Sequence, residues 1–317
     1  MSSSIRFISA AEVHAALPYP ALVDAMAAAF AAGAEAPVRS SFPVTPEGDR
    51  LLLMPAWRIG LDLGVKIVTV FPRNRAKGLA SVSALYVLLD GATGHPRALI
   101  DGEALTLRRT AAASALASTY LSRPESSCLL VVGNGALAPF MAAAHCAVRP
   151  ITKILVWGRS PERAGITVQR LKKEGLPAEP MATLEEGLAI ADIVTCATTA
   201  REPVLFGRHA RAGMHYDLVG AFTREMRECD DDLIARSRVF VDTYAGALKE
   251  SSDLADPLAK GAFGRDHLLA ELADLVTGRH PGRQARTDTT VFKSVGTALE
   301  DLCAARLVYQ RAEKDSR

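Results

Sequence analysis

The sequence predicts an α/β protein with a doubly wound parallel sheet and a second lobe of α+β type. From residue 128 onward, apolar strand-like runs alternate with helical segments, as in a parallel sheet covered on both faces. A glycine-rich segment, residues 133–138, stands where the first of these runs meets a helix. Between residues 37 and 101, short apolar runs separated by Gly, Pro and Asn are typical of antiparallel strands.

The first half of the chain is expected to open with a helix over residues 20–33, because Pro20 suits a first turn and Gly33 a helix end. A long Ala-rich helix is expected to follow Thr106 and to end near Leu121. Antiparallel strands are expected at residues 51–57, 64–71, 82–90 and 96–101.

The second half is expected to form the parallel sheet, after a domain boundary near residue 124. Thr183 and Glu186 fit a capping box that opens one of its helices. The last segment, residues 294–312, reads as an amphipathic helix. Parallel strands are expected at residues 128–132, 153–157, 193–197, 215–219 and 239–242, with further helices at 138–148 and 161–173.

Composition excludes several classes of protein. The chain has 317 residues, of which 49% are hydrophobic and 23% charged, so it can bury a large core and is not globally disordered. A net charge of +2 gives no basis for a nucleic-acid or anionic-membrane partner. Aromatic residues, at 6%, are too few to suggest a base-stacking surface.

Cysteine usage and hydropathy predict a cytoplasmic protein. The five cysteines are scattered and lack CxxC spacing, so neither a disulfide framework nor a metal site is expected. No stretch reaches 18 apolar residues, and the N-terminal Ala-rich segment is broken by Pro18, Pro20 and Asp24, so it predicts neither a signal segment nor a membrane span.

The glycine-rich segment predicts a dinucleotide site of the Rossmann type. Gly133 permits a tight turn, Gly135 lets the backbone approach a pyrophosphate, and a small Ala138 lets helix and strand pack closely. The following helix offers free N–H groups and the positive end of its dipole to phosphates. The predicted cofactor contacts from this segment are Gly133, Asn134, Gly135, Ala136, Leu137 and Ala138.

The end of the second strand bears on the choice between NAD and NADP. An NAD site usually places Asp or Glu there for the ribose 2′-hydroxyl, but this chain reads Trp157-Gly-Arg159-Ser160. Arg159 could pair with a 2′-phosphate, so NADP is favoured over NAD, the alternative being a solvated loop arginine. Ser160 and Thr198 are placed in the same cofactor-binding set.

Lys66 interrupts the apolar run of residues 64–71. Strand alternation places it on the face opposite Val65 and Ile67, which would suit solvent exposure. If it is buried instead, it must pair with a group of opposite charge, because burying an unpaired ammonium is costly.

Two arginines add to this pattern. Arg109 falls in the first turn of the helix expected after Thr106, where a cation is unfavourable unless an anion binds there. Arg39 lies in an expected loop and, taken alone, reads as a surface residue.

The chain resembles the ornithine cyclodeaminase/mu-crystallin family over nearly its whole length. The runs Arg109-Thr-Ala-Ala112 and Phe292-Lys-Ser-Val-Gly296 are not general Rossmann features, which makes the match specific. The matching segments are residues 36–40, 53–56, 64–72, 101–112, 133–138, 191–194 and 291–296, with Glu300 and Asp301.

The resemblance implies two lobes, a homodimer and a small amino- or imino-acid substrate. Residues 1–124 plus 293–317 would form the substrate-binding and dimerisation lobe, and residues 125–292 the NAD(P)-binding lobe. It also implies that the substrate carboxylate is bound by Arg39, Lys66 and Arg109, with Ser81 at a nearby hydroxyl position.

Two departures from the family pattern matter. Leu137 stands where the family usually has Gln. Phe222 stands where true cyclodeaminases carry the aspartate that does acid/base work at the substrate amine, and phenylalanine cannot exchange a proton. Asp217 replaces a usual Asn but lies five residues earlier and need not substitute for it.

These features favour an NAD(P)H-dependent imine reductase, or the reverse amino-acid dehydrogenase, with Lys66 as the catalytic residue. An iminium needs only a hydride at carbon, so the loss of an acid at Phe222 is tolerable, and Lys66 could supply charge and a proton. The alternatives are an ornithine cyclodeaminase, which releases ammonia, and a non-catalytic ligand-binding protein gated by NADP.

Overall fold

The computed structural model describes residues 5–314 and divides the chain into two compact units. The first unit comprises Met1–Thr110 and Thr297–Arg317, and the second Ala111–Gly296. The two lobes expected from the sequence had boundaries at 124/125 and 292/293. Their assignment to substrate and to cofactor remains a prediction.

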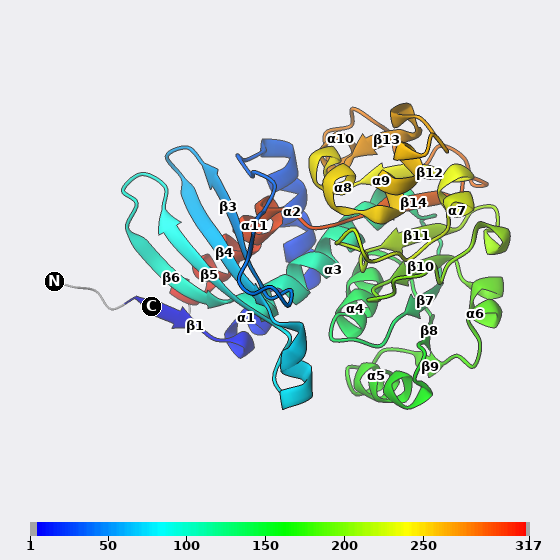
Figure 1. Cartoon of the computed structure of the whole chain (residues 1–317), viewed down its shortest axis with the longest axis horizontal. Helices are drawn as coiled ribbons and strands as arrows, with labels where there is room; N and C mark the ends of the chain where they lie inside the picture. The colour runs from blue at the N-terminus through cyan, green and yellow to red at the C-terminus, as the bar shows by residue number, and fades with distance from the viewer. Residues whose placement is uncertain (1–4, 315–317) are drawn as a thin grey trace. The chain divides into compact units, whose positions relative to one another are not determined.

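The first unit is built on a six-stranded sheet with the order β1-β6-β5-β4-β3-β2 (Figure 1). Only the β1–β6 pair is parallel. The four antiparallel strands expected from the sequence are confirmed within two residues, and the unexpected β1 and β2 are too short for a clear alternation. The strands are β1 (Arg6–Ile8), β2 (Ser40–Pro43), β3 (Arg50–Arg58), β4 (Asp62–Val70), β5 (Val82–Asp90) and β6 (Pro96–Asp101).

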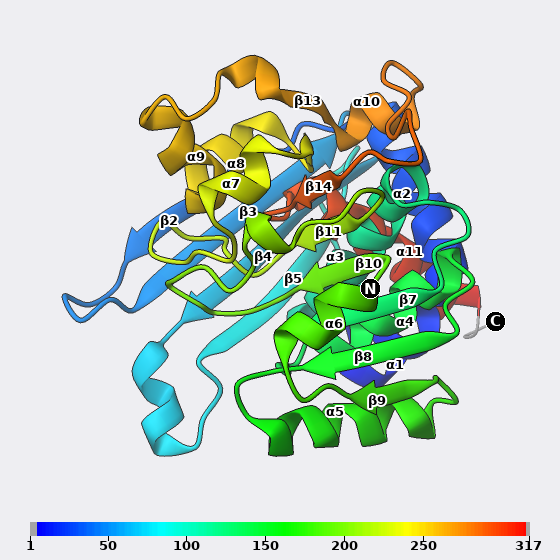
Figure 2. The same cartoon turned by 90° about the vertical axis from the view of Figure 1, so that its right-hand side faces the viewer.

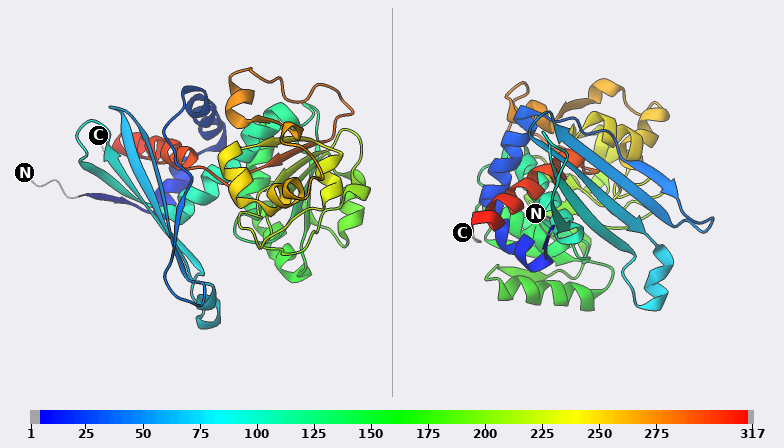
Figure 3. Two further views of the ribbon diagram at one scale, coloured as in Figure 1. Left: turned by 45° about the horizontal axis from the view of Figure 1, so that its top comes forward. Right: turned by 90° about the vertical axis from the view of Figure 1, so that its left-hand side faces the viewer.

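Helices cover one face of this sheet. The helix α11 (Ala298–Lys314) packs against β3, β4 and β5 and against α2 (Tyr19–Ala32), while α1 (Ala10–Ala16) packs against β6 and α11 (Figure 3). In β4, Gly64, Lys66 and Val68 are buried, whereas Leu63, Val65 and Ile67 are only half-buried. Alternation therefore places Lys66 on the covered face, and its solvent exposure is excluded.

The helix α3 (Gly102–Leu121) begins earlier than the sequence suggested. The carboxylate of Asp101 accepts a hydrogen bond from Ala104 N at 2.8 Å and so caps a helix that already includes residues 102–105. Arg109 consequently lies about two turns inside the helix, and its expected place in the first turn was wrong.

The second unit is a doubly wound sheet of eight parallel strands, which confirms the predicted α/β class (Figure 2). Its order is β13-β12-β14-β11-β10-β7-β8-β9. The strands that follow β7 in sequence are added first on one side of it, as β8 and β9, and then on its other side, beginning with β10. The strands are β7 (Cys128–Val132), β8 (Lys153–Trp157), β9 (Ala178–Pro180), β10 (Ile193–Cys196), β11 (His215–Leu218), β12 (Arg238–Val241), β13 (Leu268–Glu271) and β14 (Thr290–Lys293).

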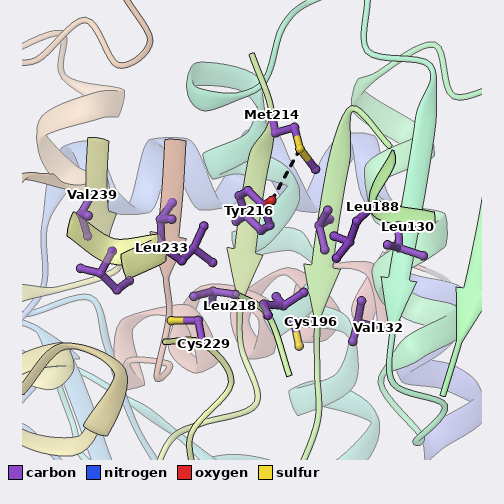
Figure 4. Packing of buried hydrophobic residues seen from close by; sticks show 14 of the residues in the cluster. Leu130, Val132, Leu188, Cys196, Met214, Tyr216, Leu218, Cys229, Leu233 and Val239 are labelled. Carbon is purple, nitrogen blue, oxygen red and sulfur yellow. Dashed lines mark hydrogen bonds between the residues drawn. The ribbon is translucent and has the colours of Figure 1, made fainter. Parts of the chain in front are cut away.

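Apolar clusters lie on both faces of this sheet. Leu129 and Val131 of β7 belong to one cluster, and Leu130 and Val132 to the other, which Figure 4 shows around Tyr216. This alternation explains why β7 reads as an unbroken apolar run. The helices are α4 (Ala138–Val148), α5 (Pro161–Lys173), α6 (Leu184–Ile190), α7 (Asp231–Ala235), α8 (Tyr244–Glu250), α9 (Ser252–Ala259) and α10 (Leu272–Val276).

The predicted start of the last helix, at residue 294, is wrong. Thr290–Lys293 forms β14 between β11 and β12, and the helix starts only at Ala298 rather than at residue 294. The buried carboxylate of Asp242 accepts hydrogen bonds from Val295 N at 2.8 Å and Gly296 N at 2.6 Å. These bonds, with a φ of 81° at Gly296, hold the segment in a non-helical turn.

Within residues 5–314, no single helix is long and apolar enough to cross a membrane, although α1 and α2, bent by 81°, would pass that test as a pair. All five cysteines are free. The described residues contain no group of three or more His, Cys, Asp or Glu side chains arranged to hold a metal ion.

Candidate active site

Lys66 lies in a buried polar cluster of the first unit. Its side chain projects from β4, and only 2% of the residue is exposed. The ammonium is 2.9 Å from the carboxylate of Asp301 on α11 and donates to Thr106 Oγ1 on α3 at 3.3 Å. Three elements distant in sequence therefore place polar groups around one amine.

Arg109 belongs to the same cluster and is 4% exposed. Its guanidinium pairs with the carboxylate of Glu300, and its Nε lies 2.9 Å from Asp301 Oδ1. Asp301 thus joins Lys66 to Arg109. Burial of these charges is tolerated because each cation has a carboxylate partner.

The cluster brings the pKa of Lys66 down toward the neutral range. Burial, followed by the nearby Arg109 guanidinium, lowers the pKa of Lys66 to about 8, although Asp301 opposes the shift. The charge of Arg39 lowers it further, which places Arg39 close enough to act on Lys66. A lysine with this pKa can both carry a positive charge and give up a proton.

The predicted clamp residues are not equally close. Lys66 and Arg109 share a partner, and the charge of the half-buried Arg39 acts on Lys66. Ser81 is different, since it precedes β5 and lies five positions along the strand from Tyr86, the residue paired with Lys66. Five residues of strand span about 16 Å, so the structure does not bring Ser81 into this cluster.

Glu300 and Asp301 are the residues of the cluster to which sequence reasoning gave no role. Both are fully buried at the start of α11. Adjacent acids within a segment predicted to be amphipathic would ordinarily be assigned to its solvent face. One signal in the sequence could have revealed them. Two cations in apolar surroundings, Lys66 and Arg109, require buried carboxylates as partners.

In the second unit, the glycine-rich loop lies where the winding direction of the sheet reverses. Gly133 follows β7, and its φ of 115° requires glycine. A Cβ at Gly133 would lie 2.7 Å from Ala197 O and 3.4 Å from Thr198 Cγ2, so the ends of β7 and β10 are in contact. Ligands of open α/β sheets bind outside such strand ends, at the point of reversal.

The residues present fit a dinucleotide cofactor. A Cβ at Gly135 would meet nothing within 4 Å, which leaves its backbone open to a pyrophosphate. The helix α4 begins after Leu137 with no side chain capping its N-terminus, so the positive end of its dipole faces the glycine-rich loop without a capping carboxylate or hydroxyl. Ala136 lies in the exposed turn between these positions, and the buried Ala138 allows close packing.

The turn after β8 carries two other predicted cofactor residues, Arg159 and Ser160, and it is bound by Asn134 of the glycine-rich loop. Asn134 donates to Ser160 O at 3.0 Å and thereby ties the glycine-rich loop to the turn after β8. Ser160 caps α5 by accepting from Arg163 N at 3.3 Å. Arg159 is exposed in the same turn, where a 2′-phosphate would lie in a site of this type.

Phe222 and Asp217, which both depart from the family pattern, have different surroundings. Phe222 is 38% exposed in the loop after β11. Asp217 is fully buried within β11, accepts from Thr195 Oγ1 at 2.7 Å and lies 3.3 Å from His145 Nε2. Asp217 is therefore enclosed in the sheet and does not substitute for an acid at position 222.

Replacing Gly133 or Gly135 by alanine should distinguish a glycine needed for folding from one needed for cofactor binding. Gly133→Ala is strained by its φ and its contact with Ala197 O, so we expect a lower melting temperature. Gly135→Ala should leave the melting temperature within a few degrees but weaken NADH binding at least about tenfold, because the new methyl group occupies the pyrophosphate approach. Calorimetry measures both effects, and equal NADH affinity in Gly135→Ala would contradict this reading.

The protein-family comparison covers almost the whole chain. The model of the ornithine cyclodeaminase/mu-crystallin family matches residues 4–316. A Delta(1)-pyrroline-2-carboxylate reductase of Colwellia psychrerythraea is 36% identical over 97% of this chain and 99% of its own length. An uncharacterized protein of Schizosaccharomyces pombe is 40% identical over the full length of both chains.

Solved structures give the same picture. The Thermococcus litoralis Delta(1)-pyrroline-2-carboxylate reductase in complex with NADH and L-proline has a TM-score of 0.94 and 34% identity, covering 98% of both chains. The iminosuccinate reductase of Paracoccus denitrificans in complex with NAD⁺ has a TM-score of 0.88 and 27% identity, covering 98% of this chain and 97% of that one.

The doubly wound sheet and its glycine-rich loop define an NAD(P)-dependent oxidoreductase of the Rossmann type. With these matches, the chain belongs to the ornithine cyclodeaminase/mu-crystallin family. Within that family it is an enzyme that reduces imino acids or catalyses the reverse reaction on amino acids.

Proposed function

We propose that the protein reduces Δ1-pyrroline-2-carboxylate, or a close cyclic imino acid, to the corresponding amino acid. The observation that carries the proposal is a group of three cations in one buried cluster: Lys66 and Arg109 share Asp301, and the charge of Arg39 acts on Lys66. Such a group suits an α-carboxylate, although Asp301 and Glu300 lie beside it. The reductases of Colwellia and Thermococcus, at 36% and 34% identity, support the choice of substrate.

The reaction needs one hydride and one proton. A nicotinamide cofactor, when held by the glycine-rich loop, would supply the hydride for C2 of the carbon–nitrogen double bond. Arg109 and Arg39 hold the carboxylate attached to C2 and so fix which carbon is presented. Lys66, with a pKa near 8, contributes charge and returns a proton to the ring nitrogen.

Oxidation of NADH and NADPH at 340 nm with Δ1-pyrroline-2-carboxylate tests this function, with proline identified by chromatography. The matched control substrate is Δ1-pyrroline-5-carboxylate, which has the same ring but carries its carboxylate away from the imine carbon. We expect turnover of the first and little of the second. No cofactor oxidation with any cyclic 2-imino acid would refute the proposal.

The cofactor preference follows from Arg159. No carboxylate follows β8 to bind a ribose 2′-hydroxyl, and the exposed Arg159 can pair with a 2′-phosphate. We expect NADPH to bind about tenfold to a hundredfold more tightly than NADH, and Arg159→Ala to remove most of that difference. Calorimetric titration measures it, and tighter binding of NADH by the unaltered protein would overturn this preference.

Phe222 predicts that ornithine is not a substrate for cyclisation. Without a carboxylate at this position, nothing there can deprotonate the substrate amine. We expect no proline and no ammonia from L-ornithine with NAD⁺ or NADP⁺, although a probable ornithine cyclodeaminase of Bordetella pertussis is 31% identical. Ammonia release from ornithine at an enzyme-like rate would contradict this interpretation, and Phe222→Asp is the informative variant.

The cytoplasmic location remains a prediction.

We also propose that the protein forms a homodimer. The sheet face of the first unit opposite α11 carries half-buried apolar side chains, among them Leu53, Val65, Ile67 and Val87. An archaeal alanine dehydrogenase with 27% identity and a TM-score of 0.91 is described as a dimer. Light scattering measures the oligomeric state.

A further inference from the structure

Glu228 joins the ends of two central strands of the second unit. Its Oε1 accepts from Thr198 N at 2.7 Å and Thr198 Oγ1 at 3.0 Å, just beyond β10. Its Oε2 accepts from Gly220 N at 2.7 Å and Ala221 N at 3.2 Å, just beyond β11. One carboxylate therefore fixes the backbone of two loops at the carboxyl edge of the sheet.

The space around this carboxylate is closed. A Cβ at Gly220 would overlap Thr198 O, Thr198 N and the Glu228 carboxylate, so glycine alone fits there. Glu228 itself is fully buried. The two loops are thus in contact as well as hydrogen-bonded to the same group.

Two further buried charges hold Glu228 in place. Lys293, at the end of β14, has its ammonium 3.8 Å from Glu228 and 3.0 Å from Asp253 of α9. Asp253 also accepts from the backbone N of Glu228 at 2.9 Å and of Cys229 at 3.3 Å. All three side chains are fully buried.

These charges depend on one another. Burial raises the pKa of Glu228, and Lys293 opposes that shift. Burial would lower the pKa of Lys293, but Asp253 and Glu228 outweigh it and raise the pKa above its ordinary value. Replacing a buried ionic network by apolar packing is often neutral or stabilising, so stability alone gives weak grounds for burying these three charges.

The network lies beside the nucleotide loop. Thr198, which Glu228 binds twice, is next to Gly133, since a Cβ there would come within 3.4 Å of Thr198 Cγ2. The loops after β7, β10 and β11 occupy neighbouring strand ends where the cofactor of a doubly wound sheet binds. Phe222, exposed in the site loop, comes directly after the fixed residues.

We propose that Glu228 is a positioning residue of the cofactor site, with Lys293 as its counter-charge and Asp253 as the group that holds both Lys293 and the Glu228 backbone. By fixing Thr198 and the Gly220–Ala221 backbone, it holds the loops that receive the nicotinamide half of the cofactor. The proposal rests on the cofactor part of the proposed function and not on the identity of the imino acid.

Glu228→Asp tests this role, because it keeps the charge beside Lys293 but is one methylene too short to reach both loops. Glu228→Gln is the second variant, which keeps the length but loses one acceptor. In both, we expect faster hydrogen exchange at the amides of Thr198, Gly220 and Ala221 and NADH binding weakened about tenfold. The maximal rate with the imino acid should fall about tenfold to a hundredfold with little change in its KM.

Thr195→Val is the matched control. Thr195 is a buried residue of β10 whose hydroxyl also binds a buried carboxylate, that of Asp217, but it lies three positions before Thr198. Its loss should lower the melting temperature without changing NADH affinity or exchange at residues 198 and 220–221.

Rescue separates positioning from stability. Combining Glu228→Gln with Lys293→Met and Asp253→Asn removes the three buried charges together, while the amide oxygen at position 253 can still accept from the backbone N of residues 228 and 229. This combined variant should recover melting temperature but not NADH affinity. NADH affinity that recovers together with stability, or that equals that of the unaltered protein in either single Glu228 variant, would overturn the proposal. If the single variants do not fold, the combined variant alone decides. Exchange and NADH binding are measured without substrate, so inactivity toward imino acids would refute the proposed function and leave this test intact.

Discussion

Replacing Lys66 by Met is expected to lower kcat/KM for the imino acid by about a thousandfold. Met fills nearly the same space but removes a buried positive charge beside the carboxylate site and the proton donor, and either loss alone costs on the order of a hundredfold. NADH affinity should be unchanged, because Gly133, Gly135 and the rest of the nucleotide loop belong to the second unit. Steady-state kinetics and a cofactor titration measure the two effects.

The pH profile adds a sharper test of Lys66. With its pKa lowered to about 8, chiefly by burial, the ammonium is present below that pH and lost above it. A proton donor of this kind makes kcat/KM fall as the pH rises through about 8. Lys66→Arg keeps the charge but does not titrate in this range, so the fall should disappear. A fall that persists unchanged in Lys66→Arg would assign it to another group.

Replacing Arg109 by Ala is expected to abolish activity and to destabilise the first unit by about 3–5 kcal/mol. The change removes the partner of Glu300 and one partner of Asp301, which leaves buried carboxylates undercompensated. Arg109→Lys should restore part of the stability and little of the activity, since an ammonium cannot reproduce the planar fork of a guanidinium. Urea unfolding measures the stability, and the imine-reduction assay measures the activity.

Arg108 provides the control for Arg109. It is the preceding residue of α3, but it is half-buried, lies over the ring of Tyr19 and donates to His14. Arg108→Ala should cost about 1 kcal/mol or less and leave kcat/KM near normal. Equal losses in the two variants would show that Arg109 is no more than a packing residue.

Much of the fold was predictable, because it depends on local pattern. The strands β3 to β6 alternate apolar residues between glycine- and proline-rich turns, and their predicted bounds hold within two residues. The strand β7 with Gly133 and Gly135 is a local motif whose physical requirements are met in the structure. Short pieces such as β1 and β9, of three residues each, offered no periodicity to detect.

The sequence predicted the cations of the polar cluster but not their carboxylate partners. The cations Lys66 and Arg109 were conspicuous, but their partners Glu300 and Asp301 lie 191 and 235 residues away in sequence. Composition and periodicity cannot predict which residues pair over such distances in sequence. The misplaced start of α3 made Arg109 look like a helix-end cation awaiting an anion, whereas its actual partners are carboxylates of the same chain.

The pairing of Lys66 with Asp301 also sets an order of events during synthesis on the ribosome. The 235 intervening residues take on the order of tens of seconds to translate, at about 5–20 residues per second. Until α11 emerges, the ammonium and the guanidinium of the cluster lack Asp301 and Glu300 as partners, and the sheet lacks the helix that covers β3, β4 and β5. A message truncated just after codon 296 would therefore yield the complete second unit attached to a first unit unable to finish its core.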